Sequence, residues 1–161
     1  METAALVLTP LRPEDAGEVF SMTSSPAVAR FMRFDTHTRR EETAALIEEY
    51  TASSNRGFAL RRKTDGRFVG VFALKAGETP GVYTISVFLG EAHWGHGYFT
   101  QLLGRMIPYA REVLQASVLQ AYVVGENLSS RRVLEDSGFS VAEILRFDEL
   151  SDGLYIYRLA L

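Results

Sequence analysis

The stretch from residue 93 to residue 110, HWGHGYFTQLLGRMIPYA, decides how the rest of the chain is interpreted. Gly95 and Gly97 precede a run with helical character, and the apolar run from Val87 to Leu89 lies just upstream. This order predicts a strand, a glycine-rich turn and a helix. Glycine reaches left-handed backbone angles without strain, and the first N–H groups of a helix attract phosphate. The turn is therefore either a purely structural bend or a phosphate-binding loop.

The helix after the turn carries apolar residues at helical spacing, which predicts one buried face. Pro108 lies inside this helix, where it removes one backbone hydrogen bond and presses on the carbonyl of Gly104. We therefore expect a kink there. The residues of the apolar face are Leu102, Leu103, Met106, Ile107, Ala110, Val113 and Leu114.

Upstream of the turn, residues 4–11 predict a first strand, and two helices are expected to begin at Pro13 and Pro26, the second capped by Ser25. A third helix is expected within residues 36–50, opened by a capping box in which Thr38 pairs with a glutamate three residues later. That glutamate is Glu41, and the inner face of the helix is expected to hold Ala44, Ile47 and Tyr50 or Thr51.

The remaining segments read as strands and one more helix. Residues 57–77 predict two strands joined at Asp65-Gly66, a strong hairpin signal. Further strands are expected over residues 81–89 and 117–124. Hairpins beside crossover helices imply one mixed sheet with helices on its faces.

The C-terminal part predicts a helix and a last hairpin. Asn127 suits the helix cap or the turn just before it, and Gly138 suits the left-handed position after the helix end, with Phe139 closing over it. The last two strands are expected to turn at Asp152-Gly153.

Length and composition narrow the function classes. The 161 residues suffice for one domain, and 17 basic against 20 acidic residues argue against a broad nucleic-acid surface. No apolar run approaches the ~20 residues of a membrane span, and the N-terminal residues lack the basic start of a signal peptide. The absence of cysteine excludes disulfides and suits a reducing compartment. We therefore expect a cytoplasmic protein without membrane or nucleic-acid partners.

The glycines alone do not identify a ligand. A dinucleotide fingerprint needs a third glycine at the position of Thr100, and a nucleotide P-loop needs Gly-Lys before Ser or Thr. On this pattern alone, a structural turn is favoured. His93 and His96 are three residues apart, but the chain has only one other histidine, His37, so no metal site is expected.

The surroundings of the glycines change that balance. Residues 94–98, Trp-Gly-His-Gly-Tyr, resemble the acyl-coenzyme A motif of the GCN5-related N-acetyltransferase (GNAT) superfamily, and most closely its ribosomal-protein (RimJ/RimL-like) branch. A second block with Asn127, Ser130, Gly138 and Phe139 resembles the strand–Asn–helix–Gly-Phe block of that superfamily. The resemblance covers nearly the whole chain.

The resemblance implies a single α/β (α+β) domain over residues 1–161, with a mixed, mostly antiparallel sheet of about seven strands and helices on both faces. It implies an N-acetyltransferase that moves an acetyl group from acetyl-CoA to a primary amine, without a metal. The implied cofactor-binding residues are Val87, Phe88, Leu89, Trp94, Gly95, His96, Gly97, Tyr98, Phe99, Thr100, Asn127 and Ser130.

Three positions depart from the superfamily pattern. Ala92 occupies the position where Arg or Gln often begins the motif. Thr84 occupies the position where many relatives have a Glu that acts as the catalytic base. Leu134 occupies the position where many have a Tyr that protonates the departing thiolate. The resemblance to the ribosomal-protein branch implies that Ser130 hydrogen bonds to the departing thiolate. Ser130 equally suits the first turn of a helix, where its hydroxyl would satisfy the cap.

The missing base bears on the acceptor. At pH 7 about a tenth of α-amines are neutral, but only about one lysine in 2,500. This favours a protein N-terminus or another small amine as acceptor. Two alternatives remain: an acyl-CoA-binding or sensing module without strong catalysis, and an interaction protein in which the turn is structural. An exposed sheet edge or the last hairpin could also support a homodimer.

Overall fold

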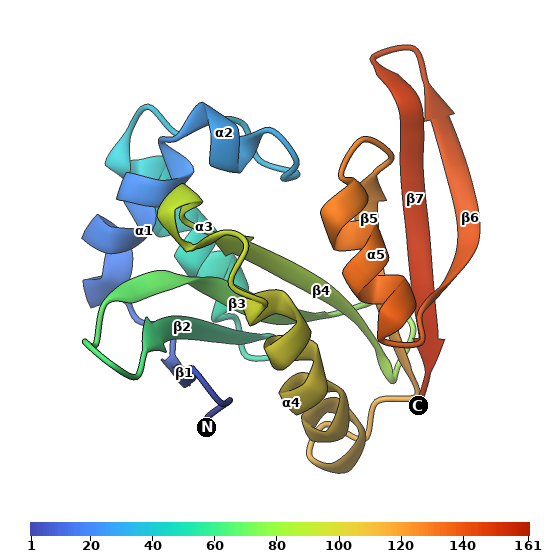
Figure 1. Cartoon of the computed structure of the whole chain (residues 1–161), viewed down its shortest axis with the longest axis horizontal. Helices are drawn as coiled ribbons and strands as arrows, with labels where there is room; N and C mark the ends of the chain where they lie inside the picture. Colours follow the sequence, from blue (N-terminus) through green and yellow to red (C-terminus); the bar gives the residue numbers. More distant parts are fainter. The chain divides into compact units, whose positions relative to one another are not determined.

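Seven strands form one mixed sheet in the order β1-β2-β3-β4-β5-β7-β6 in this computed structural model, which describes residues 1–161 (Figure 1). The pairs β1–β2, β2–β3, β5–β7 and β6–β7 are antiparallel, and β4–β5 is parallel. The expected mostly antiparallel sheet is therefore confirmed. The chain divides into two compact units, residues 1–75 with 86–98 and residues 76–85 with 99–161.

The first unit begins with a strand and three helices, as the sequence predicts. Its elements are β1 (Leu6–Pro10), the 3₁₀ helix η1 (Pro13–Asp15), α1 (Ala16–Thr23), α2 (Pro26–Ala29), α3 (Arg40–Tyr50), β2 (Arg56–Arg62), β3 (Phe68–Ala76), the end of β4 (Val82–Leu89) and η2 (Glu91–His93).

Apolar side chains from α1, α2 and α3 form one core with side chains of β2, β3 and β4. The residues of β3 are almost all buried, because they form a nearly continuous apolar run that the helices cover. Val19 of α1 and Val71 of β3 are fully buried there. Gly66 has φ +70° in the β2–β3 turn, which confirms the predicted hairpin.

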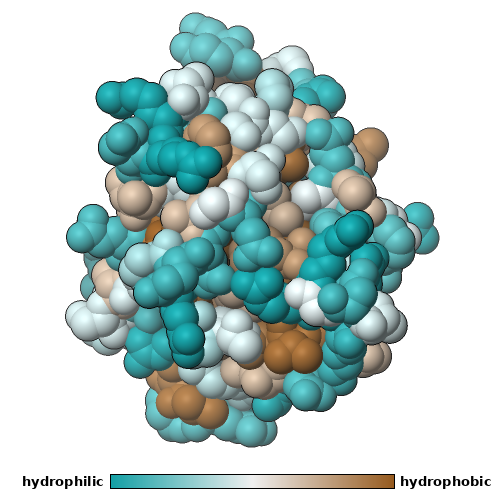
Figure 2. All heavy atoms as spheres, turned by 90° about the vertical axis from the view of Figure 1, so that its left-hand side faces the viewer, coloured by the Kyte–Doolittle hydropathy of each residue, from teal (hydrophilic) through white to brown (hydrophobic).

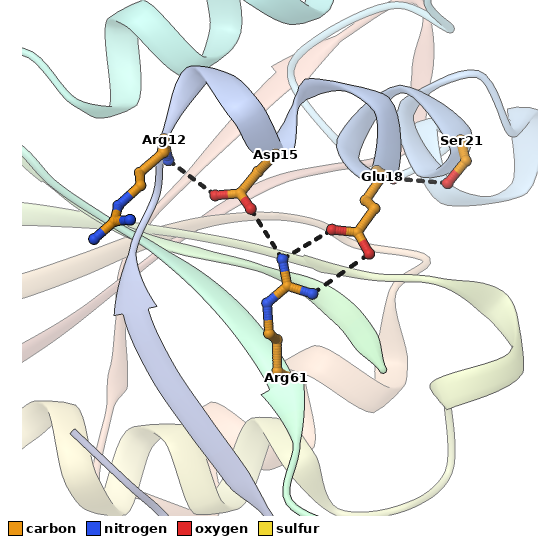
Figure 3. A network of polar contacts seen from close by, with 5 residues as sticks. All are labelled: Arg12, Asp15, Glu18, Ser21 and Arg61. Atoms are coloured by element: carbon orange, nitrogen blue, oxygen red, sulfur yellow. Dashed lines mark hydrogen bonds and ion pairs between the residues drawn. The ribbon is translucent and has the colours of Figure 1, made fainter. Parts of the chain in front are cut away.

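Polar contacts fasten the start of α1 to β2 (Figure 3). The Arg61 guanidinium lies 3.0 Å from the Asp15 carboxylate and 2.9 Å from the Glu18 carboxylate. Asp15 also accepts the backbone N–H of Arg12 at 2.9 Å. Figure 2 faces the side where α1 lies and shows a mostly hydrophilic surface with small, separate hydrophobic patches.

Helix α3 begins one residue later than the capping box predicted. The Glu42 carboxylate, and not that of Glu41, accepts the backbone N–H groups of Thr38 at 2.8 Å and Arg39 at 2.9 Å. The inner face agrees with the prediction at Ile47 and Tyr50 but not at Ala44. Ala44 is exposed, and the buried residues are Thr43, Leu46, Ile47 and Tyr50.

The second unit holds the start of β4, most of α4 (Tyr98–Glu112), β5 (Val118–Val124), α5 (Leu128–Asp136), β6 (Ser140–Phe147) and β7 (Leu150–Ala160). Leu102, Leu103, Met106 and Ala110 of α4 are buried as predicted. Val113 was expected on the same face, but it lies beyond the helix end and is 62% exposed. The kink at Pro108 stays a prediction.

The last hairpin turns at a different place from the one predicted. β6 and β7 are joined at residues 148–149, and Asp152-Gly153 lies inside β7. Gly153 has φ +76°, and a Cβ there would lie 2.7 Å from the Leu145 carbonyl oxygen. The register of β7 against β6 shifts at this point, so the Asp-Gly pair forms a bulge.

None of the helices combines the length and apolar character that crossing a lipid bilayer requires. No group of three or more His, Cys, Asp or Glu side chains is arranged to hold a metal ion.

Candidate functional site

The glycine turn follows β4 and the short helix η2, within the first unit. Gly95 has φ +75° and Gly97 has φ +72°, backbone angles that residues with a side chain rarely adopt. The N–H groups of these two glycines donate no backbone hydrogen bond, and α4 begins at Tyr98. The turn therefore offers unpaired donors at the positive end of a 15-residue helix, an arrangement suited to an anion.

Two hydrogen bonds anchor the residues around the turn to the strands. The Trp94 indole Nε1 donates to the Leu89 carbonyl at 2.9 Å, and the Gly90 N–H donates to the Val69 carbonyl at 3.0 Å. The rest of the Trp94 ring is largely on the surface, with 47% of its area exposed. The sequence suggested no such anchoring role for this tryptophan.

The three residues at the end of β4 differ in what they can offer a ligand. Phe88 is buried, and its ring meets the ring of Phe34 edge-on at a centroid distance of 5.5 Å. Val87 and Leu89 are half-buried. The side chain of Phe88 thus belongs to the core, and only its backbone remains available for a cofactor.

The histidines beside the turn have different surroundings. His96 is exposed and stacks on the buried Tyr98 at a ring-centroid distance of 5.4 Å. His93 is only 6% exposed, and its Nδ1 has no hydrogen-bond partner. Burial is the main cause that lowers the pKa of His93, with further contributions from Arg62 and Arg67.

The remaining predicted site residues lie in the second unit. Phe99 is half-buried and Thr100 exposed in the first turn of α4. Asn127 caps α5, as predicted, because its Oδ1 accepts the Ser130 N–H and the Ser129 hydroxyl, each at 3.3 Å. The half-buried Ser130 hydroxyl makes no hydrogen bond, so the capping role suggested for it belongs to Asn127.

Two of the three positions that depart from the superfamily pattern, Thr84 and Leu134, lie in the second unit. The Thr84 hydroxyl accepts a hydrogen bond from Gln120 Nε2 at 3.0 Å, and Gln120 Oε1 accepts one from Arg158 at 3.3 Å. The side chain at position 84 is therefore a hydroxyl and not a carboxylate. Leu134 is fully buried and fills a core position.

One buried polar contact near the end of β4 has no local sequence signal. The Tyr50 hydroxyl of α3 lies 2.5 Å from the Ser86 hydroxyl of β4. Burial raises the pKa of Tyr50 to about 12, although the contact with Ser86 opposes this shift. Tyr50 therefore stays protonated at neutral pH and positions β4.

Comparison with known proteins identifies the family. Residues 5–140 match the acetyltransferase (GNAT) domain family. The chain is 23% identical to the uncharacterized N-acetyltransferase YoaA of Bacillus subtilis over 151 residues, covering 91% of this chain and 85% of YoaA. It is 31% identical to the probable N-acetyltransferase YjcK of the same organism over 121 residues, covering 73% of this chain and 63% of YjcK.

Solved structures share the fold. A GNAT-family acetyltransferase from Bacillus anthracis superposes with a TM-score of 0.85 at 17% identity, covering 99% of this chain and 97% of that one. A spermidine N-acetyltransferase from Vibrio cholerae, in complex with CoA and spermine, gives 0.84 at 15% identity, covering 96% and 95%. The family match spans most of the chain and the fold agrees with it, so the chain belongs to the GNAT family and is an acyl-CoA-dependent acetyltransferase.

Proposed function

We propose that residues 1–161 form one GNAT domain of the RimJ/RimL-like branch, which transfers an acetyl group from acetyl-CoA to a primary amine in the cytoplasm. The observation that carries the donor side is the glycine turn, with two left-handed glycines, unpaired N–H groups and a helix start. Coenzyme A contains a pyrophosphate, which matches this set of donors.

The cofactor-binding roles follow the chemistry of each segment. The N–H groups of residues 95–100, after Trp94, would hold the pyrophosphate. The backbone of Val87, Phe88 and Leu89 would pair with the pantetheine arm, which is supported by a β4–β5 register that ends at Ile85. Asn127 would orient the same arm from the start of α5.

The transfer would proceed by direct attack within a ternary complex. The amine nitrogen bonds to the thioester carbonyl carbon, the C–S bond breaks, the amine loses a proton and the thiolate gains one. Ser130 would donate a hydrogen bond to the departing sulfur, which is supported by its unpartnered hydroxyl. The Leu89 N–H would polarise the thioester carbonyl.

The acceptor would be an amine that is often neutral near pH 7. Thr84 offers no proton acceptor near neutral pH, which favours a peptide N-terminus or another amine of low pKa. The Vibrio cholerae neighbour that was solved with spermine adds polyamines to the small amines worth testing.

We also propose that the protein forms a homo-oligomer. Val141, Ile144 and Phe147 of the edge strand β6 are all more than a third exposed, which is unusual for such side chains. One Vibrio cholerae neighbour is described as dodecameric. Light scattering across a concentration series would test this assembly.

The decisive test of the donor is thermal unfolding with and without acetyl-CoA. Ligand at 100 times its dissociation constant should add about 2.7 kcal/mol to the free energy of unfolding and raise the melting temperature by several degrees. Thiol release with a panel of N-terminal peptides, diamines and polyamines then identifies the acceptor. No shift up to millimolar acetyl-CoA would disprove the proposal, and a shift without thiol release would indicate a binding module.

A further inference from the structure

We propose that the tip of the β2–β3 hairpin, residues 62–67, is a second anion-binding element, in which Arg62 and Arg67 contact a phosphate group of acyl-CoA. This inference rests on the proposed binding of acyl-CoA at the glycine turn. It concerns residues of the first unit only, and the superfamily motif includes none of them.

The hairpin tip lies at the same end of the first unit as the glycine turn. The Gly90 N–H donates to the Val69 carbonyl at 3.0 Å, which ties the start of β3 to the end of β4. The Arg62 N–H donates to the Arg67 carbonyl at 2.9 Å and closes the hairpin. Both arginines are close enough to His93, just before the turn, to influence its protonation.

The hairpin tip carries more positive than negative charge. The Arg62 guanidinium holds the Asp65 carboxylate with two hydrogen bonds, of 3.0 and 2.6 Å. This pairing, and then the Tyr98 hydroxyl, raise the pKa of Arg62. Arg67 is exposed and has no ion-pair partner. The tip thus carries two guanidinium groups and one carboxylate, and Arg62 lies beside Tyr98, the first residue of α4.

His93 provides a second, independent observation. Only 6% of the area of His93 is exposed, yet its Nδ1 has no hydrogen-bond partner. After burial, Arg62, Arg67 and His96 all lower the pKa of this imidazole, and only Asp65 opposes them. A buried polar atom without a partner calls for an explanation, and the excess positive charge around it favours an anion.

Phosphate is the anion that the geometry favours. A guanidinium presents a planar fork of donors that matches phosphate oxygens, and turn N–H groups bind the same group from another side. Coenzyme A carries both a pyrophosphate and a 3′-phosphate. Dephospho-CoA lacks the 3′-phosphate and pantetheine lacks all phosphates, so these ligands distinguish the two sources.

Two variants of opposite sign test the proposal by isothermal titration calorimetry. Arg67→Gln should weaken CoA binding about fivefold, because it removes one exposed charge contact. Asp65→Asn should tighten it by a similar factor, because it removes the competing carboxylate from Arg62. Asn keeps an oxygen for the Arg67 N–H, which Asp65 accepts at 3.1 Å, and Asn-Gly suits the same hairpin turn.

Arg12→Gln serves as the matched control. It removes the same charge from the same unit, and the Arg12 side chain points away from the Asp15 and Glu18 carboxylates (Figure 3). This variant should leave the dissociation constant of CoA unchanged. Circular dichroism and melting temperature establish that each variant is folded.

The outcomes separate the two proposals. If Arg67→Gln weakens CoA but not dephospho-CoA, the contact is to the 3′-phosphate, and if it weakens both, the contact is to the pyrophosphate. Unchanged CoA affinity in both hairpin variants would overturn the hairpin site alone. Absence of CoA binding by the wild-type protein would instead overturn the proposed function.

Discussion

Gly95 and Gly97 have left-handed backbone angles, and a Cβ at either position would meet no atom within 4 Å. The two interpretations of the turn are therefore not exclusive. The backbone needs glycine for its φ angles, and the same choice leaves open space beside the N–H groups. A side chain here strains the backbone and also occupies the side from which a phosphate would approach.

Gly97→Ala should separate these two effects. We expect a loss of about 1–2 kcal/mol in the free energy of unfolding from left-handed strain, together with a larger relative loss of acetyl-CoA affinity. Gly138→Ala is the control, because Gly138 also has a positive φ, of +92°, with only ordinary contact at 3.6 Å. Denaturant titration and calorimetry measure both quantities, and equal acetyl-CoA affinity in the two variants would favour a purely structural turn.

Ser130→Ala tests the proposed contact with the leaving thiolate. Loss of a hydrogen bond to a charged sulfur should lower kcat about tenfold or more and leave the KM for acetyl-CoA nearly unchanged. Ser129→Ala is the neighbouring control, since the Ser129 hydroxyl contacts only the capping Asn127. Steady-state kinetics with the best amine of the panel measure the effect, and similar kcat values in both variants would remove Ser130 from the mechanism.

At the scale of elements, the two Asp-Gly pairs show that the same local sequence can form two different structures. Asp65-Gly66 forms the predicted hairpin turn, whereas Asp152-Gly153 forms a bulge inside β7. Both glycines have positive φ, but only the turn predicted at Asp65-Gly66 is confirmed, and the one predicted at Asp152-Gly153 was wrong. The Gly125 N–H donates to the Gly153 carbonyl at 2.9 Å, a contact between distant segments that no local pattern contains.

The contact between α3 and β4 predicts an alkaline instability. The pKa of Tyr50 is about 12 in the folded chain and 10.0 ordinarily. Between these values the unfolded chain loses a proton that the folded chain keeps, so the free energy of unfolding falls as pH rises, by about 3 kcal/mol. Below pH 10 this contribution is fully present.

Tyr50→Phe should remove that part of the alkaline loss. At pH 7 the variant should be about 1 kcal/mol less stable, because the Ser86 hydroxyl loses its partner. The deficit should shrink or reverse by pH 11–12. Urea titrations of both proteins at pH 7, 9 and 11 measure it, and a constant difference across this range would contradict the role assigned to burial of Tyr50.

At the scale of the whole molecule, the residues proposed to bind acyl-CoA come from both compact units. The turn and the end of β4 belong to the first unit, and Asn127 and Ser130 belong to the second. The exchange of backbone amides tests the two sets separately, one in each unit. With saturating CoA we expect amide hydrogen exchange to fall at residues 94–98 and at residues 127–131.

The β6–β7 turn of the second unit provides the internal control for this exchange experiment. Amides of the β6–β7 turn at residues 148–149 carry no proposed ligand contact and should exchange equally with and without CoA. Mass spectrometry of peptides after timed labelling measures the pattern. Protection limited to the first unit would separate Asn127 and Ser130 from the cofactor site.

The order of strands and helices, the caps at Ser25 and Asn127 and the left-handed glycines of the turn were all predictable from the sequence. These features depend on residues within a few positions of one another, where backbone sterics and local hydrogen bonds dominate. The resemblance to the GNAT superfamily also lies in such short spacings, and the family match over residues 5–140 confirmed it.

The tertiary structure alone decided the burial of His93, the contact of Tyr50 with Ser86 and the position of the Arg62–Asp65 pair beside the glycine turn. It also placed the last turn at residues 148–149 and moved the α3 capping role to Glu42. Some of these features depend on how segments distant in the chain pack together. The others depend on a shift of one residue in strand register or in the start of a helix. Burial and long-range pairing are properties of the packed chain, so no local pattern contains them.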